Sequence, residues 1–431
     1  MSPCPTLRAL AAATLALLAG ACASEPEAPA PPPRAPRYEP PALATGPWRA
    51  VLRSPGGELP FGLELDRAHG RQWRATVVNG RERIPVRRVG WDGRGFVLAF
   101  DHYDSAITAE ASLDGRRLTG RWVKRPGTDR EVRMDFEARA GAAPRFEQSA
   151  PAGAEGGSPL HGRWRVDFAS SEDPAVGIFE PGPAGSTVGT FLTTTGDYRW
   201  LAGAADARTL RLSGFDGAHA FLFRAVLRED GTLAGDFWSS ARWHERWNAR
   251  RDDEARLPDA FAQTTWREEV RIGDLRFRDL EGNERALDDP AFAGKARIVY
   301  LFGSWCPNCH DATELLAQLH ERFGPRGLSI VGLAFEVTGD PARDAAQVRR
   351  YAALHGVKWP LLLAGTSDKA AATLQLAALD RVRSYPTTVF LHGDGRVRAV
   401  HTGFSGPATG EAHRELVTRF ETLIEELLAR Q

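Results

Sequence analysis

The most informative segment of this 431-residue sequence is Gly303-Ser304-Trp305-Cys306-Pro307-Asn308-Cys309-His310. Residues 297–302, just before it, form a short, mainly apolar run with β-branched side chains, which is typical of a buried strand. Residues 308–323 place apolar side chains on one helical face, at Ala312, Leu315, Leu316, Leu319 and Phe323. We therefore expect the two cysteines at the point where a strand turns into a helix.

That position gives the two cysteines different roles. The N-terminus of a helix presents unpaired backbone N–H groups and the positive end of the helix dipole, which favour a thiolate over a thiol. Pro307 suits the first helical turn, where its missing N–H has no partner to lose. We expect Cys306 to attack a partner disulfide, and Cys309, one turn further on, to resolve the mixed disulfide.

The first 22 residues read as an export signal. Arg8 and the α-amine give a weakly positive start, and residues 9–18 are apolar. Ala19-Gly20-Ala21-Cys22 then resembles a bacterial lipobox, although Leu usually stands where Ala19 does. We expect Cys22 to be lipidated, while cleavage after Ala21 or after Ala23 stays open. Residues 23–45 are rich in Pro and Ala, as expected of an extended tether.

These features predict a periplasm-facing lipoprotein of the cell envelope. Ala23 is not the Asp often associated with retention at the inner membrane, so the outer membrane is the expected site. Beyond the first 25 residues no apolar stretch is long enough to span a bilayer, so contact with the membrane is expected only through the lipid. Lys plus Arg equals Asp plus Glu, 55 each, which argues against nucleic acid as a partner.

Cysteine usage also indicates a reactive pair. Of the four cysteines, Cys4 and Cys22 lie in the N-terminal segment, and Cys306 and Cys309 remain for the folded body. Exported proteins commonly use disulfides for stability. A bridge across three positions adds little, however, because the gain in chain entropy grows with loop length. The pair is therefore expected to react rather than to stabilise.

A chain of this length is expected to form two or three domains. Residues 46–140 and 160–255 read as two copies of one antiparallel β unit, joined by a linker at 141–159. Asp-Gly and Asn-Gly turns separate alternating runs such as 95–101 and 106–113. The Trp residues are expected to pack in cores rather than to bind a ligand. Landmarks recur at an offset of 116, at Gly46/Gly162, Trp48/Trp164, Gly80/Gly196, Asp114/Asp230, Gly115/Gly231 and Trp122/Trp238.

From residue 277 the pattern changes to alternating strands and helices, as in an α/β domain. A second motif, Ser384-Tyr385-Pro386-Thr387-Thr388, stands at the start of an expected strand. A proline that begins a strand just after an aromatic residue suits a cis peptide in a tight loop. The elements expected after residue 323 are strands at 329–334, 361–363, 387–391 and 397–402, and helices at 340–355 and 411–429.

Residues 270–431 resemble the thioredoxin superfamily and, within it, the TlpA-like envelope thiol–disulfide oxidoreductases. The resemblance rests on Gly294-Lys295, the Trp-Cys-Pro-Asn-Cys motif, the Tyr-Pro-Thr loop and an inserted helix–strand segment at 340–363. It implies a site of Trp305, Cys306, Cys309 and a cis Pro386 packed against the cysteines. It further implies exchange with protein or peptide disulfides in the reducing direction, an upstream membrane electron donor, and no cofactor or metal.

Two features depart from thioredoxin. Tyr300 stands where thioredoxin has a buried Asp six residues before its first Cys. Glu336, at the end of the second expected strand, is the best substitute proton acceptor, and a solvated strand-end Glu is the alternative. The dipeptide between the cysteines is Pro-Asn rather than Gly-Pro, so the reduction potential stays open within roughly −270 to −120 mV.

The same residues allow other functions. Cys306-Pro-Asn-Cys309-His310 also fits the C-x-x-C-H signature of covalent haem, but haem leaves the preceding strand and the Tyr-Pro-Thr loop unexplained. Peroxiredoxins carry Pro and Thr at the positions of Val299 and Gly303 here, so a peroxiredoxin-like antioxidant role is a weaker alternative. A metal site would need ligands beyond two thiolates and His310. A partner-binding or chaperone-like lipoprotein with a minor redox role is the remaining alternative.

Overall fold

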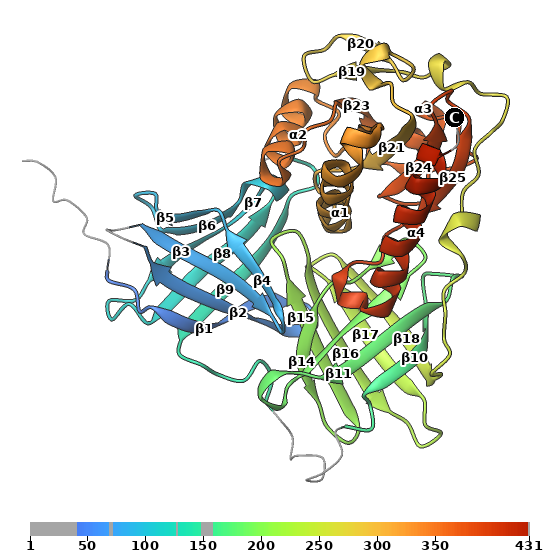
Figure 1. Ribbon diagram of the computed structural model, residues 1–431. Helices are drawn as coiled ribbons and strands as arrows, with labels where there is room; N and C mark the ends of the chain where they lie inside the picture. Colours follow the sequence, from blue (N-terminus) through green and yellow to red (C-terminus); the bar gives the residue numbers. More distant parts are fainter. Residues whose placement is uncertain (1–40, 69–71, 126–127, 148–157, 430–431) are drawn as a thin grey trace, which may run out of the picture. The chain divides into compact units, whose positions relative to one another are not determined.

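The computed structural model describes residues 41–68, 72–125, 128–147 and 158–429 (Figure 1). The export signal, Cys22 and most of the predicted tether lie outside the described residues. The described chain forms three sheets, two of nine strands and one of seven. None of the helices in these ranges has the length and hydropathy needed to cross a membrane.

The first sheet is a nine-stranded antiparallel sheet in the order β4-β3-β2-β1-β9-β8-β7-β6-β5. Tight turns with a glycine in the left-handed region join its strands, for example Gly80, with φ of 60° between β3 and β4. Strand β7 ends at Ala111, earlier than predicted, and Leu113 is fully exposed in the following turn. The strands are β1 (Gly46–Ser54), β2 (Gly57–Arg67), β3 (Trp73–Asn79), β4 (Glu82–Val86), β5 (Arg88–Trp91), β6 (Phe96–Phe100), β7 (Ser105–Ala111), β8 (Arg117–Lys124) and β9 (Val132–Ala140).

The second sheet is also antiparallel, in the order β11-β10-β18-β17-β16-β15-β14-β12-β13. It closes on itself, because β11 pairs with β12 as well as with β10. Its strands are β10 (Gly162–Phe168), β11 (Ala175–Pro181), β12 (Thr187–Thr193), β13 (Gly196–Asp197), β14 (Leu201–Ala205), β15 (Thr209–Phe215), β16 (Ala220–Leu227), β17 (Leu233–Ser239) and β18 (Trp243–Arg251).

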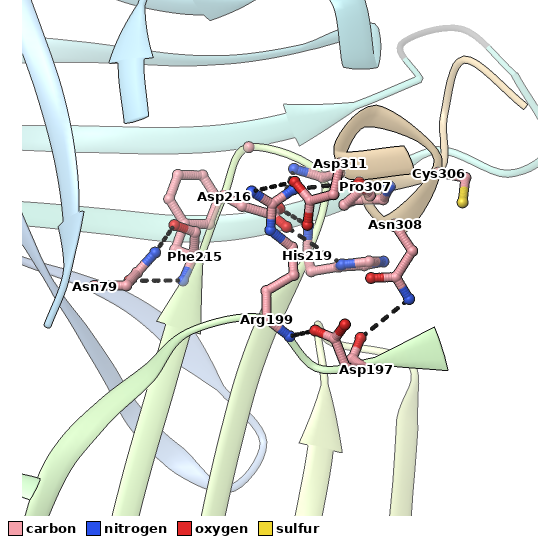
Figure 2. Close-up of polar contacts among 12 residues, drawn as sticks. Asn79, Asp197, Arg199, Phe215, Asp216, His219, Cys306, Pro307, Asn308 and Asp311 are labelled. Atoms are coloured by element: carbon pink, nitrogen blue, oxygen red, sulfur yellow. Dashed lines mark hydrogen bonds and ion pairs between the residues drawn. The ribbon is translucent and has the colours of Figure 1, made fainter. Parts of the chain in front are cut away.

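Phe215, the last residue of β15 in the second sheet, packs into the core of the first sheet. Its ring centroid lies 4.6 Å from that of Phe61 and 5.4 Å from that of Trp122, both in the first sheet. The side chain of Asn79 donates to the Phe215 carbonyl at 2.8 Å and accepts from its N–H at 3.3 Å (Figure 2). The two sheets therefore share buried apolar surface, and the prediction of a β-rich N-terminal region is confirmed.

The third sheet has the order β20-β19-β23-β22-β21-β24-β25, with β21, β22 and β23 parallel. The predicted strands and helices agree to within three residues at each end. The helix α3 and the short strands β19 and β20 have too few buried positions to give a periodic signal. The elements are β19 (Arg276–Asp279), β20 (Glu284–Ala286), β21 (Ala296–Phe302), α1 (Pro307–Phe323), β22 (Leu328–Glu336), α2 (Pro341–His355), β23 (Leu361–Thr366), α3 (Lys369–Gln375), β24 (Thr387–His392), β25 (Val397–Thr402) and α4 (Glu411–Ala429).

The register of this sheet brings the two predicted motifs together. Strand β21 is buried at all seven positions, and α1 begins five residues after it ends. Strand β24 runs antiparallel to β21, with Thr387 paired to Leu301. The residue before β24, Pro386, therefore lies at the same sheet edge as the start of α1.

Candidate active site

The side chain of Cys306 caps the N-terminus of α1. Its Sγ accepts a hydrogen bond from the backbone N–H of Cys309 at 3.2 Å and contacts the Tyr385 carbonyl oxygen at 3.5 Å. Cys306 is 6% exposed and Cys309 is fully buried. The N-terminus of α1 therefore directs a backbone N–H at the Cys306 sulfur.

The proline loop lies directly against this sulfur. The Tyr385–Pro386 peptide is cis, as expected. The indole of Trp305 donates to the Phe335 carbonyl at 2.9 Å and meets the Tyr385 ring edge-on, with centroids 5.9 Å apart. The structure thus brings Trp305, Cys306, Cys309 and Pro386 to one edge of the sheet.

Glu336, the last residue of β22, is 2% exposed, so the alternative of a solvated strand-end carboxylate is wrong. Its Oε1 accepts from the backbone N–H of Ser304, and its Oε2 from the Ser304 hydroxyl, each at 2.7 Å. Burial raises the pKa of Glu336 to about 7, although both bonds from Ser304 act to lower it. A cavity of about 30 Å³ adjoins the carboxylate, lined also by Arg125, Trp305 and Asp344, and is large enough for a water molecule.

The thiol of Cys309 is a weaker acid than a thiol in water. Burial raises the pKa of its thiol well above the usual value, and the hydrogen bond and charge of Cys306 raise it further. The charge of Glu336 acts on the pKa of Cys309 in the same direction, so the protonation of the two groups is linked. Losing the Cys309 proton is easier when Glu336 is neutral, or when it takes up that proton.

Tyr300 has a different role from the acid that it replaces. Its hydroxyl donates to the carbonyl oxygen of Cys309 at 2.8 Å, and the Tyr351 hydroxyl donates to the same oxygen at 2.9 Å. Burial raises the pKa of both phenols well above the usual value. The two tyrosines therefore hold the backbone of the first helical turn as neutral donors. Tyr351 was not predicted, because only the tertiary fold brings α2 beside α1.

Residues 270–400 match the model of the AhpC/TSA family. The thioredoxin-like protein YneN of Bacillus subtilis is 25% identical over 130 residues, covering 30% of this chain and 68% of the relative. The thiol-disulfide oxidoreductase ResA of Halalkalibacterium halodurans is 24% identical over 139 residues, covering 32% of this chain and 70% of the relative. The C-terminal region is a thioredoxin-like domain of the AhpC/TSA family. The predicted superfamily, its TlpA-like branch and the enzyme class of thiol–disulfide oxidoreductases are confirmed.

Solved structures similar to the thioredoxin-like domain include the following two. A thiol:disulfide interchange protein DsbE from Chlorobium tepidum is 15% identical, with a TM-score of 0.29, and the match covers 38% of this chain and 99% of that one. A secreted disulfide oxidoreductase of Mycobacterium tuberculosis is 18% identical, with a TM-score of 0.26, and the match covers 34% of this chain and 95% of that one.

His310 follows the dithiol but is fully engaged in hydrogen bonds. Its Nε2 lies 2.9 Å from the Ser304 carbonyl oxygen, so Nε2 carries the proton, and Nδ1 accepts from Nε2 of His355 at 2.6 Å. Burial lowers the pKa of His310 well below its usual value, and that of His355 to about 4. With both nitrogens occupied, His310 is a poor axial ligand for haem. No group of three or more His, Cys, Asp or Glu within the described ranges could hold a metal.

Residues of the second β sheet also reach the thioredoxin-like domain's redox motif. The Asn308 amide donates to the Asp197 carbonyl at 3.1 Å, and the Arg199 guanidinium donates to the Pro307 carbonyl at 3.3 Å (Figure 2). Sequence reasoning missed Asp197 and Arg199, because the only local signal is Gly196, which marks a turn without saying what it contacts.

Proposed function

We propose that this protein exchanges disulfides with protein or peptide substrates through Cys306 and Cys309, as a lipid-anchored reductase of the cell envelope. The single observation that carries the proposal is the position of Cys306. Its sulfur accepts the N–H of Cys309 at 3.2 Å and lies 3.5 Å from the carbonyl before Pro386. A nucleophilic thiolate, a resolving thiol one turn away and a backbone acceptor for substrate are the parts that disulfide exchange requires.

The first step forms a mixed disulfide. The Cys306 thiolate attacks one sulfur of the substrate disulfide, which forms a new S–S bond and releases the other substrate sulfur as a thiolate. In the second step, Cys309 loses its proton and attacks the Cys306 sulfur. The Cys306–Cys309 disulfide forms, the substrate leaves as a second thiolate, and two electrons have passed from the dithiol to the substrate.

Glu336 is proposed as the acceptor of the Cys309 proton. Burial raises the pKa of both Cys309 and Glu336, and a Glu336 pKa of about 7 leaves a large fraction of carboxylate at neutral pH. The adjoining cavity of about 30 Å³, lined by Ser304, Trp305 and Glu336, offers room for a water beside the carboxylate. Trp305 packs against Tyr385 and holds the proline loop beside the sulfur.

The proposed direction of exchange and the proposed lipid anchor are supported by features of the sequence. The TlpA-like resemblance favours the reducing direction and an upstream membrane electron donor, and Ala19-Gly20-Ala21-Cys22 favours lipidation and the outer membrane. Mass spectrometry of the mature N-terminus tests the anchor. A diacylated Cys22 supports it, and an unmodified N-terminus at Cys22 or Ser24 contradicts it.

Trapping of mixed disulfides tests the redox roles. The Cys309→Ser variant can attack a substrate disulfide but cannot resolve it, so it is expected to accumulate covalent complexes with an oxidised model peptide. The Cys306→Ser variant is the matched control and is expected to accumulate none. Complexes with the second variant alone would reverse the two roles, and complexes with neither would contradict disulfide exchange.

We further propose that residues 46–140 and 160–255 are two copies of one β unit. Two equivalent hydrogen bonds support the repeat. The Trp48 indole donates to the Ala44 carbonyl at 3.1 Å, and the Trp164 indole, 116 positions later, donates to the Leu160 carbonyl at 3.0 Å. Each tryptophan is 2% exposed. The proposed layout is thus an anchor, a tether, two β units and the thioredoxin-like domain.

A further inference from the structure

A loop of the second β sheet lies on the redox motif. This capping loop, residues 194–199, connects β12 to β14 and includes the two residues of β13. Its backbone makes two hydrogen bonds to the thioredoxin-like domain. The Thr195 carbonyl accepts from the Ser384 hydroxyl at 2.6 Å. The Asp197 carbonyl accepts from the Asn308 amide at 3.1 Å (Figure 2). One of these donors lies between the two cysteines, and the other lies two residues before the cis proline.

The approach of this backbone to Asn308 is as close as a glycine permits. Gly196 has a φ of 152°, and a Cβ there would lie 2.0 Å from the Asn308 amide nitrogen. Any other residue at position 196 would be strained at this φ and would have to displace the Asn308 amide that binds the loop. A glycine at this position allows the loop backbone to lie against the dithiol turn.

Ionic and polar contacts hold the start and the middle of the capping loop. At its start, the Thr194 hydroxyl donates to Asp173 at 2.9 Å, and Asp173 also forms an ion pair with Arg383 of the proline loop. In its middle, the Asp197 carboxylate accepts from the backbone N–H of Gly406 at 2.5 Å. The start and the middle of the loop are therefore both tied to the thioredoxin-like domain.

Arg199 fixes the far end of the capping loop to helix α1. Its guanidinium lies 2.8 Å from a Glu82 oxygen and 3.2 Å from an Asp311 oxygen, and it donates to the Pro307 carbonyl. These groups come from the first sheet and from α1. An arginine held between two carboxylates in a largely buried position is costly to separate from them, because an uncompensated charge would remain.

The capping loop occupies polar groups that surround the sulfur a substrate disulfide must reach. Pro307, Asn308 and Ser384 flank Cys306, and each of them already has a partner in the capping loop. Only 6% of Cys306 is exposed. A protein disulfide must bring its own backbone to the sulfur, so it competes with the loop for the same polar groups.

We propose that the capping loop is a built-in competitor for the substrate and selects which disulfides reach Cys306. With the loop in place, small disulfides and small thiol reagents reach the sulfur, whereas a protein disulfide reaches it only after the loop is displaced. This inference rests on the proposed exchange function and gives the β region a part in it. The apparent affinity for a protein substrate is the intrinsic affinity reduced by the fraction of molecules in which the loop is open.

Alkylation of Cys306 in the reduced full-length protein tests the inference without requiring turnover. Iodoacetamide serves as the small reagent and a polyethylene-glycol maleimide as the bulky one, with the modified residue identified by peptide mass spectrometry. The loosening variants are Asp197→Ala and Arg383→Ala. The matched control is Arg398→Ala, which removes an ion pair of 3.0 Å with Glu426 inside the thioredoxin-like domain.

Wild-type Cys306 is expected to react with iodoacetamide and only slowly with the polymer. Loss of one charge-assisted contact shifts a two-state population by roughly 5- to 30-fold. The ratio of polymer to iodoacetamide labelling should therefore rise by that factor in both loosening variants and stay unchanged in Arg398→Ala. Arg383→Ala alone decides the result if Asp197→Ala does not fold, as judged by circular dichroism.

Two outcomes would overturn the inference. One is a wild-type labelling ratio equal to that of the denatured protein, and the other is an unchanged ratio in a folded loosening variant. Neither outcome depends on disulfide exchange. A protein that keeps exchange activity but shows no size selectivity contradicts the capping loop alone, and a protein that shows size selectivity without exchange contradicts the proposed function alone.

Discussion

Glu336 holds Ser304 by both of its carboxylate oxygens, each at 2.7 Å, one to the backbone nitrogen and one to the hydroxyl oxygen. Ser304 stands two residues before Cys306, so the carboxylate is tied to the loop that carries the nucleophile. Because burial raises the pKa of Glu336 to about 7, its charge changes across the neutral range. Both the rate of exchange and the stability of the fold should respond.

Glu336→Gln is expected to slow disulfide exchange at neutral pH. A glutamine can keep hydrogen bonds to Ser304 but cannot accept the Cys309 proton, and loss of such a proton acceptor costs roughly 10²-fold or more in rate. Stopped-flow kinetics with an oxidised model peptide between pH 6 and 9 measure the rate of exchange. Glu321→Gln, on the exposed side of α1, is the control. Wild-type rates for Glu336→Gln across this range would remove Glu336 from the mechanism.

The raised pKa of Glu336 also predicts how the free energy of unfolding depends on pH. Its pKa in the folded protein, about 7, lies above the usual 4.5, so the folded state binds the proton more tightly than the unfolded state. Its contribution is complete below about pH 4.5 and is lost as the pH rises through 7, at a cost of about 3 kcal/mol. Urea unfolding at several pH values should show this loss in the wild type. In Glu336→Gln, the free energy of unfolding should fall less steeply with pH. An equal dependence of the free energy of unfolding on pH in the two proteins would contradict the raised pKa of Glu336.

The sequence was sufficient to predict the elements that local patterns specify. Strand β21 and helix α1 meet at the dithiol because an apolar run and a helical apolar face adjoin Cys306, and these features need no tertiary information. The burial of Glu336 could not be deduced, since the end of a strand can face either the core or water. Only the register of β22 and the packing of α2 bury that carboxylate away from bulk solvent.

The capping loop lay beyond sequence reasoning for a different reason. Asp197 and Arg199 lie 109 and 107 residues before Cys306, and no periodicity connects them to it. Arg199 has two carboxylate partners only because Glu82 and Asp311 come together in the folded chain. Contacts between distant segments depend on tertiary placement, which a single sequence does not specify.

Tyr300→Phe is expected to lower stability but to leave the pH dependence of exchange unchanged. The Tyr300 hydroxyl donates to the Cys309 carbonyl, which Tyr351 also serves, so the variant loses one of two hydrogen bonds to that oxygen. The expected cost is about 1 kcal/mol, measured by urea unfolding. A shifted pH–rate profile would instead indicate that Tyr300 exchanges protons with the dithiol.

Slow reaction with hydrogen peroxide is expected of the reduced protein. Val299 and Gly303 stand at the positions where peroxiredoxins carry Pro and Thr, and the nearby Ser304 hydroxyl is already bound to Glu336. The site therefore has no hydroxyl at position 303 to orient a peroxide. Peroxide consumption and thiol loss should match those of an unactivated thiol, with Cys306→Ser as the blank. Rapid turnover coupled to dithiol oxidation would restore the antioxidant alternative.

Phe215→Ala should weaken the core of the first β sheet and its contact with the second. Phe215 is 1% exposed and packs edge-on against Phe100, with centroids 5.6 Å apart, as well as against Phe61 and Trp122. Removing a buried aromatic ring costs about 3–5 kcal/mol, since the transfer free energy is lost and a cavity remains. Urea unfolding followed by tryptophan fluorescence measures this loss.

Leu113→Ala is the control for that experiment, because Leu113 is fully exposed and its truncation should change the free energy of unfolding by less than about 0.5 kcal/mol. The shape of the unfolding curve carries further information. If the two sheets unfold together through their shared core, Phe215→Ala shifts one transition. A loss below about 1 kcal/mol would mean that the ring is not buried between the sheets, and the capping loop would then be held by a β region whose two sheets fold independently.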